Sequence, residues 1–203
     1  QYWQEVGGKT PRYYQQVAIN KAVNAVLEGQ NRILLTMATG TGKTFVAFQI
    51  VWRLWKSKRK KRILYLADRN FLIDQAKDRT FSPMGQALHK IKGKATKSRE
   101  VYFALYQALA NPITGENLYE KYPHDFFDLI IVDECHRGSA NEFGSWRKIL
   151  EYFSPATQIG MTATPRRTDN VDTYEYFGDP IYTYTLRQGI DDGFLAPYRV
   201  YRV

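Results

Sequence analysis

Short, uninterrupted apolar runs alternate along this chain with stretches of helical periodicity. Runs that predict buried strands lie at residues 32–37 (RILLTM), 62–67 (RILYLA), 87–91 (ALHKI), 100–106 (EVYFALY), 126–134 (FFDLIIVDE) and 156–164 (ATQIGMTAT). Strands that are apolar at every position are typical of parallel sheets, which helices cover on both faces. The alternation therefore predicts an α/β fold with its ligand site at the carboxyl ends of the strands.

The stretches between these runs predict the covering helices, at 10–28, 42–57, 70–80 and 145–153. In the first, Thr10 is expected to be the N-cap and Pro11 the first helical residue, before a stop at Gly29. Its apolar face is expected to hold Val17, Ala18, Ala22, Ala25 and Val26. Turn-forming residues between 111 and 125 predict a surface excursion.

Composition limits the class of protein. A chain of 203 residues with 44% hydrophobic residues can bury one core, and its net charge of +9 favours a polyanionic partner. The single cysteine, Cys135, excludes an internal disulfide framework, and no signal peptide or spanning apolar run is evident. A cytoplasmic protein without membrane contact is expected. The start at Gln1 and the strand-like end PYRVYRV indicate a piece of a longer protein.

Residues 37–44 (MATGTGKT) are similar to the phosphate-binding pattern G-x-x-x-x-G-K-[ST], with Met37 in place of the first glycine. Gly40 and Gly42 can turn backbone N–H groups inward, Lys43 can reach the outer phosphates, and Thr44 can ligate magnesium. Because Met37 lies where the strand ends, its side chain can pack into the sheet without harming the loop. The nucleotide-binding residues are predicted to include Thr39, Gly40, Thr41, Gly42, Lys43 and Thr44, with ATP or GTP and Mg²⁺ as ligands. A chance Gly-Lys-Thr is the rejected alternative.

Two adjacent carboxylates follow the strand of residues 129–132. At the same sheet edge as the phosphate loop, Asp133 is expected to face Mg²⁺, and Glu134 to orient or deprotonate the attacking water. With Lys43 they form the predicted catalytic set. An ordinary acidic turn is the alternative. Cys135 and His136 are rejected as a nucleophile pair or metal site, since neighbouring side chains rarely converge and there is no second Cys-His cluster.

These elements together resemble motifs I, II and III of superfamily 2 helicases and translocases: ATGTGKT, DECH and TAT. The resemblance implies a RecA-like P-loop domain over 1–197, with 198–203 beginning a linker or second RecA-like domain. It also implies that Gln15 in RYYQQVAI reads the adenine base with Arg12 beside it. His136, Thr162 and Thr164 would couple hydrolysis to movement, although threonines at strand ends are commonly just turn residues.

Residues 64–76 and 102–109 resemble motifs Ia and Ib, which contact a nucleic-acid backbone in that superfamily. The matching positions are Arg69, Asn70, Tyr106 and Gln107. Each follows a predicted strand, so they are expected at the edge that holds the nucleotide. Ordinary helix capping, with Asn70 as the cap, is the alternative.

Four segments narrow the resemblance to the motor subunit of type I restriction endonucleases: LADRNFLIDQA, DECHRGS, GMTATPRR and residues 176–200. The resemblance implies an ATP-driven translocase that pumps duplex DNA with specificity and modification subunits. A nuclease domain would precede Gln1, and a second RecA-like domain would supply an arginine finger. Residues 1–203 alone are then expected to be nearly inactive, because losing such a finger costs about a thousandfold or more in rate.

The sequence contains two clusters of basic residues outside these motifs. Residues 56–62 (KSKRKKR) join a helix end to a strand start, which predicts a solvated connector at the edge opposite the phosphate loop. Residues 90–99 could touch DNA or a partner subunit. Three further functions stay open: another superfamily 2 DNA or RNA helicase, a nucleic-acid-independent ATPase, and a non-catalytic binding module.

Overall fold

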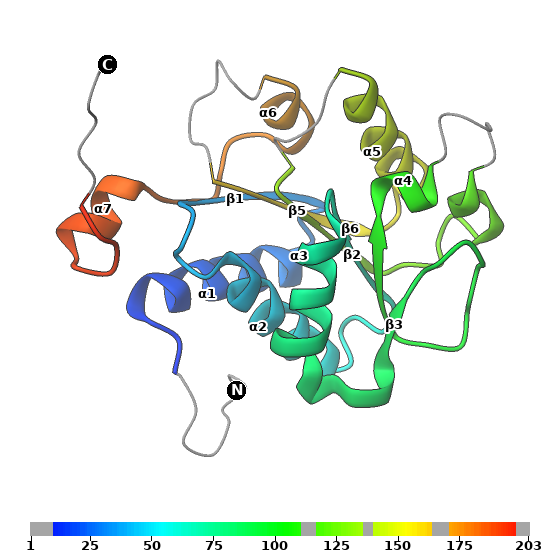
Figure 1. Ribbon diagram of the computed structural model, residues 1–203, viewed down its shortest axis with the longest axis horizontal. Helices are drawn as coiled ribbons and strands as arrows, with labels where there is room; N and C mark the ends of the chain where they lie inside the picture. Colours follow the sequence, from blue (N-terminus) through cyan, green and yellow to red (C-terminus); the bar gives the residue numbers. More distant parts are fainter. Residues whose placement is uncertain (1–9, 111–116, 136–139, 164–170, 198–203) are drawn as a thin grey trace.

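In the computed structural model, which describes residues 10–110, 117–135, 140–163 and 171–197, one parallel sheet forms the centre of the molecule (Figure 1). The sheet has seven strands in the order β3-β4-β2-β5-β6-β1-β7, and every pairing between neighbours is parallel. The strands are β1 (Arg32–Met37), β2 (Ile63–Ala67), β3 (Leu88–Lys90), β4 (Val101–Leu105), β5 (Leu129–Asp133), β6 (Thr157–Thr162) and β7 (Tyr182–Tyr184). The predicted parallel α/β fold is confirmed.

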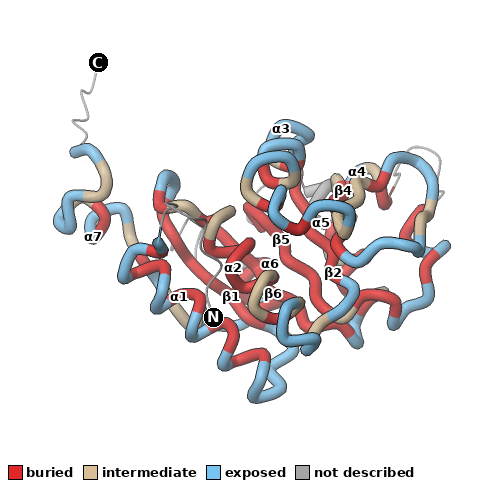
Figure 2. Tube along the Cα trace, turned by 90° about the horizontal axis from the view of Figure 1, so that it is seen from below, coloured by how far each residue is buried: buried red, intermediate tan, exposed pale blue. Residues whose placement is uncertain are grey.

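Helices cover both faces of this sheet. One face carries α1, α2 and α3, and the other carries α5 and α6 (Figure 1). The α-helices are α1 (Tyr13–Leu27), α2 (Lys43–Lys56), α3 (Asn70–Gln75), α4 (Tyr106–Leu109), α5 (Ala140–Tyr152), α6 (Val171–Phe177) and α7 (Leu186–Asp191). A π-helix, η1 (Ala76–Thr80), continues α3, and 3-10 helices form η2 (Ser82–Ala87) and η3 (Leu118–Lys121). The central strands are buried along their length, whereas the helices are exposed on their outer sides (Figure 2).

The first helix begins later than expected. Arg12 is the N-cap and Tyr13 the first helical residue, so Thr10 and Pro11 lie outside the helix. The reason is local: the side-chain oxygen of Gln15 accepts the backbone N–H of Arg12 at 2.9 Å, and Arg12 itself is extended. The prediction for Val17 is also wrong, because its side chain remains 38% exposed while Ile19 and Val23 are buried.

Part of the predicted surface excursion is in fact core. Leu118, Tyr119 and Tyr122 are buried, and the ring of Tyr122 contacts Tyr102 and Phe127 at the far end of the sheet. The sequence did not predict this burial, because the aromatic side chains are spaced irregularly among turn-forming residues. Residues 111–116 lie outside the described part of the chain.

The connector at 56–62 lies at the amino ends of the strands, opposite the phosphate loop, as predicted from its position between α2 and β2. Its last three residues are anchored at this edge: Lys60 donates to the Thr157 hydroxyl of β6 at 2.8 Å, and Asp128, just before β5, accepts the N–H groups of Lys61 and Arg62. These bonds support its interpretation as a structural connector.

The second basic cluster joins β3, which borders the sheet, to its neighbour β4. Lys90 forms an ion pair with Asp74 at 2.5 Å, and the guanidinium of Arg99 donates to the Gln86 carbonyl at 2.7 Å. Lys92, Lys94 and Lys97 are exposed between these anchored ends. A role in binding DNA or a subunit stays a prediction for them.

Candidate active site

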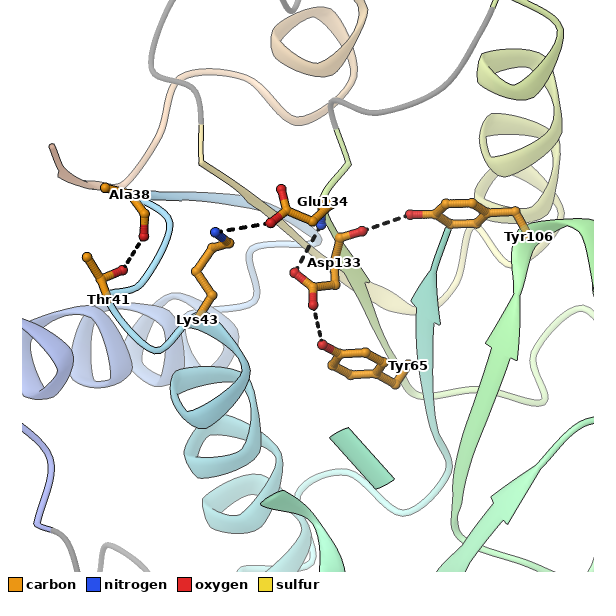
Figure 3. A network of polar contacts seen from close by, with 7 residues as sticks. All are labelled: Ala38, Thr41, Lys43, Tyr65, Tyr106, Asp133 and Glu134. Atoms are coloured by element: carbon orange, nitrogen blue, oxygen red, sulfur yellow. Dashed lines mark hydrogen bonds and ion pairs between the residues drawn. The ribbon is translucent and has the colours of Figure 1, made fainter. Parts of the chain in front are cut away.

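Strand order brings the predicted motifs together. β6 lies between β1 and β5, and all three run in the same direction. The phosphate loop follows β1, Thr162 ends β6, and Glu134 follows β5. The three segments therefore meet at one edge of the sheet, where the amino end of α2 also lies (Figure 3).

The phosphate loop has a backbone that favours glycine. Gly40 and Gly42 both have φ of +84°, in the left-handed region that other residues enter only with strain. Met37 is fully buried in the core between the sheet and α1 and α2. The methionine that stands in place of the usual glycine therefore leaves the loop intact. Thr41 folds inward, with its hydroxyl donating to the Ala38 carbonyl at 2.6 Å, whereas Thr39 and Gly40 are exposed.

The start of α1 supports this loop. Gln15 donates from Nε2 to the Thr41 carbonyl at 2.8 Å, and the hydroxyl of Tyr14 donates to the same oxygen at 3.1 Å. Arg12 is exposed next to Gln15, with its guanidinium 4.5 Å from the centre of the Phe194 ring. Gln15 thus links α1 to the loop directly, and its predicted reading of adenine, with Arg12 alongside, remains a prediction.

Lys43 and Glu134 form an ion pair across the site. The ammonium nitrogen lies 3.2 Å from Oε1 of Glu134, and both side chains are largely buried (Figure 3). Glu134 has φ of +52°, an uncommon conformation for a residue with a side chain. Such local strain, on the order of 1–3 kcal/mol, is typical of functional positions. Here the turn directs the carboxylate toward Lys43 at the amino end of α2.

Asp133 is held by two tyrosines that sequence reasoning did not assign to the catalytic set. The hydroxyl of Tyr65 on β2 donates to Oδ2 of Asp133 at 2.5 Å, and that of Tyr106 donates to its backbone carbonyl at 3.0 Å (Figure 3). The other carboxylate oxygen accepts the N–H of Glu134. Burial raises the pKa of Asp133, while Tyr65 and Lys43 oppose that rise. Burial also raises the pKa of both tyrosines well above normal, so both remain neutral donors.

The predicted coupling residues are only partly visible. Thr162 is fully buried at the end of β6, paired in register with Thr36 of β1. His136 and Thr164 lie outside the described residues. Cys135 directly precedes His136. Its carbonyl accepts a hydrogen bond from the hydroxyl of Thr173 on α6 at 3.0 Å, and its N–H donates to the Met161 carbonyl at 3.1 Å. The turn after the two acids is thereby fixed to β6 and α6.

The four predicted DNA contacts differ in exposure. Arg69, Asn70 and Gln107 are exposed after β2 and β4, at the edge that holds the phosphate loop. Arg69 rather than Asn70 is the N-cap of α3, so the capping alternative for Asn70 is wrong. Tyr106 is only 2% exposed and hydrogen-bonded to Asp133, which corrects its expected position as a DNA-facing side chain. Contact of the other three with DNA remains a prediction.

The donor groups fit a magnesium nucleotide. Mg²⁺ binds oxygen ligands, commonly one or two from protein together with phosphate oxygens and water. Asp133 offers a carboxylate and Thr44, partly exposed at the start of α2, offers a hydroxyl. Among the described residues, no group of three or more His, Cys, Asp or Glu could hold a metal ion by itself.

A parallel sheet with a glycine-rich loop entering a helix, and acids ending a strand two positions away, defines a RecA-like P-loop fold. Comparison with known proteins identifies the family. Residues 8–167 match the model of the family described as type III restriction enzyme, res subunit. The chain belongs to this family.

Curated relatives carry type I restriction names. The chain is 59% identical over all 203 residues to the EcoAI endonuclease subunit of Escherichia coli, of which it spans 25%. It is 36% identical to the EcoKI endonuclease subunit of Escherichia coli strain K12, with 91% of this chain and 17% of that protein aligned. The resemblance to type I motor subunits is confirmed, and the chain spans about a quarter or less of these relatives.

Solved structures agree with the fold. A fragment assigned as the HsdR subunit of a type I restriction enzyme from Vibrio vulnificus YJ016 superposes with a TM-score of 0.78 at 58% identity, covering 98% of this chain and 34% of that one. The helicase domain of Hef from Pyrococcus furiosus gives 0.65 at 23% identity, covering 86% and 38%, and shows the fold alone. In the described part of the chain, no helix is long and apolar enough to span a bilayer.

Proposed function

We propose that this domain binds and hydrolyses ATP with Mg²⁺ as the motor of a DNA translocase in a type I restriction enzyme. The observation that carries the proposal is the convergence of Lys43, Glu134 and Asp133 behind the phosphate loop. The 59% identity with the EcoAI endonuclease subunit over the whole chain supports the type I assignment.

The ion pair between Lys43 and Glu134 gives each residue a role in the proposed reaction. Lys43 binds the outer phosphates, and in doing so it leaves the carboxylate of Glu134. Glu134 can then accept a proton from the attacking water, which is general-base catalysis. Backbone N–H groups of the loop, with Gly40 and Gly42 in left-handed conformations, cradle the phosphates. Bound Mg²⁺, held by Asp133 and Thr44, would neutralise charge that develops on the phosphates.

DNA would follow the same edge of the sheet in this proposal. Arg69, Asn70 and Gln107 are exposed there, after β2 and β4. A second RecA-like domain of the same polypeptide would close over the site and supply an arginine finger. Specificity and modification subunits would select the DNA. Residues 1–203 alone would therefore hydrolyse ATP slowly, even with DNA present.

The deciding experiment is the ATPase rate of the full-length subunit, assembled with its partner subunits, in the presence of duplex DNA, single-stranded DNA or RNA. Stimulation mainly by duplex DNA is expected for a translocase. Preference for single strands or RNA would favour the helicase alternative. A rate indifferent to every nucleic acid would identify a nucleic-acid-independent ATPase and overturn the motor proposal.

The bond from Tyr65 to Asp133 yields a second prediction. Tyr65→Phe removes the hydroxyl that orients the carboxylate while leaving the ring in the core. Partners that orient a metal ligand typically contribute about 10–100-fold in metal affinity. We expect the Mg²⁺ concentration for half-maximal nucleotide binding to rise roughly tenfold, as measured by calorimetric titration at a fixed ATP concentration.

The matched control is Tyr152→Phe, which removes a partly buried hydroxyl that donates to the Tyr122 carbonyl at the carboxyl end of α5. That variant should keep the Mg²⁺ dependence of the wild type. Equal Mg²⁺ dependence in the wild type and in Tyr65→Phe would show that Tyr65 serves only the core.

A further inference from the structure

The end of the described chain forms a border of the nucleotide site. β7 pairs with β1, the strand that leads into the phosphate loop, and the Tyr184 carbonyl accepts the N–H of Ala38 at 3.0 Å. The α7 helix follows at the same side of the molecule, next to α1 (Figure 1). The first residue of the loop is therefore held by a segment from the far end of the sequence.

A tyrosine clamp fixes the turn after α7. The hydroxyls of Tyr13 and Tyr184 both donate to Oδ2 of Asp192, the latter at 2.6 Å. Tyr184 also stacks on Tyr14, with parallel rings 4.1 Å apart. The hydrogen bonds from Tyr13 and then Tyr184 lower the pKa of the Asp192 carboxyl, so the clamp keeps its charge at neutral pH.

The clamp sets the position of Phe194 and Leu195. Gly193 turns with φ of +74°, and the N–H groups of the next two residues both donate to the Gly189 carbonyl at 2.9 Å. Leu195 is then directed at the phosphate loop: a methyl group added to Gly40 would lie 3.1 Å from its side chain. Phe194 lies against Tyr14, with ring centres 5.3 Å apart.

Phe194 also supports Arg12. The guanidinium carbon of Arg12 lies 4.5 Å from the centre of the Phe194 ring, and Arg12 is otherwise exposed beside Gln15. A guanidinium is planar and can stack on an aromatic system with either face. An arginine already held on one face has less side-chain freedom to lose when a second flat group stacks on it.

We propose that Phe194 is a positioning residue for the base of the bound nucleotide. It holds the Arg12 guanidinium flat at the border of the phosphate loop, and a purine ring stacks on that guanidinium next to Gln15. This inference rests on the proposed binding of ATP at the loop. It assigns the tail after α7, clamped through Asp192, to recognition of the base rather than of the phosphates.

The test separates base from phosphate recognition in the full-length subunit. Dissociation constants are measured for ATP and for inorganic tripolyphosphate, which has no base, both with Mg²⁺. Phe194→Leu keeps an apolar side chain against Tyr14 and removes the aromatic face. We expect ATP to bind roughly tenfold more weakly, in line with the contribution of one stacked base, and tripolyphosphate to bind as in the wild type.

Two further variants make the result specific. Phe194→Tyr keeps the ring and should bind ATP as the wild type does. Leu186→Ala, an exposed position on α7 just before this tail, should change neither constant. In the double variant Arg12→Lys with Phe194→Leu, ATP affinity should fall no further than in Arg12→Lys alone, because Phe194 acts through Arg12.

Other outcomes would overturn the inference. Equal weakening of both ligands by Phe194→Leu would mean that the tail only supports the loop. Unchanged ATP affinity in Phe194→Leu, with the wild type binding ATP, would remove Phe194 from the site and leave the proposed function standing. If the wild type bound neither ligand, the proposed function itself would fail.

Discussion

Lys43→Ala is expected to slow ATP hydrolysis by the full-length subunit about a thousandfold. The ammonium group of Lys43 lies at the start of α2, directly behind the phosphate loop, where positive charge can meet the outer phosphates. Removing one preorganised group that stabilises developing charge typically costs about 10²–10³-fold in kcat. A loss at the upper end of this range is expected because the site is largely buried. Phosphate release with saturating duplex DNA measures it.

The control for this change lies on the same helix. Lys56→Ala removes an exposed lysine at the carboxyl end of α2, at the opposite edge of the sheet. Its rate should stay within about twofold of the wild type, since exposed charges contribute little. A Lys43→Ala subunit that still hydrolysed ATP at a comparable rate would contradict the assignment of the phosphate loop.

Glu134→Gln should separate ATP binding from turnover. The side chain keeps its shape but can no longer accept a proton, and general-base catalysis typically contributes about 10²–10⁴-fold. ATP affinity should be maintained or increased, because Lys43 no longer has to leave a carboxylate to reach phosphate. Single-turnover hydrolysis gives the rate constant and equilibrium binding gives the dissociation constant for ATP, both measured on the same preparation.

Glu151→Gln provides the matched change in charge. That carboxylate is exposed on α5, where it pairs with Arg147 one turn earlier, so both binding and turnover should be preserved. Normal turnover in Glu134→Gln would remove Glu134 as the base. Loss of ATP binding together with turnover would show that Glu134 is needed to shape the loop.

Most elements of the fold were predictable because the apolar runs coincide with the strands. The prediction for residues 32–37 matches β1 at both ends, since the strand is buried at every position after Arg32. The start of α1 was not predictable from Thr10 and Pro11. It depends on Gln15, whose side chain both caps the Arg12 N–H and bonds Thr41, a contact between distant parts of the chain.

The support of Asp133 shows a similar limit. Tyr65 interrupts an otherwise aliphatic, fully buried strand, and a buried tyrosine hydroxyl normally needs a partner. That signal indicates that some acceptor lies nearby, but it does not identify which one. Tyr106 gave a misleading signal, because its position after a strand is equally compatible with an exposed or a buried ring. β4, β2 and β5 are neighbours in the sheet, and only this strand order brings both hydroxyls within hydrogen-bond distance of Asp133.

The sequence by itself determined the parallel α/β class and the groups that can bind phosphate, ligate magnesium and accept a proton. These properties follow from residue types and their local order, since a glycine-rich turn or a strand ending in acids needs no distant partner. The tertiary structure decided which groups meet. Strand order sets Lys43 against Glu134 and brings Phe194 to Arg12, because both contacts join segments that are remote in sequence and adjacent only in the folded sheet.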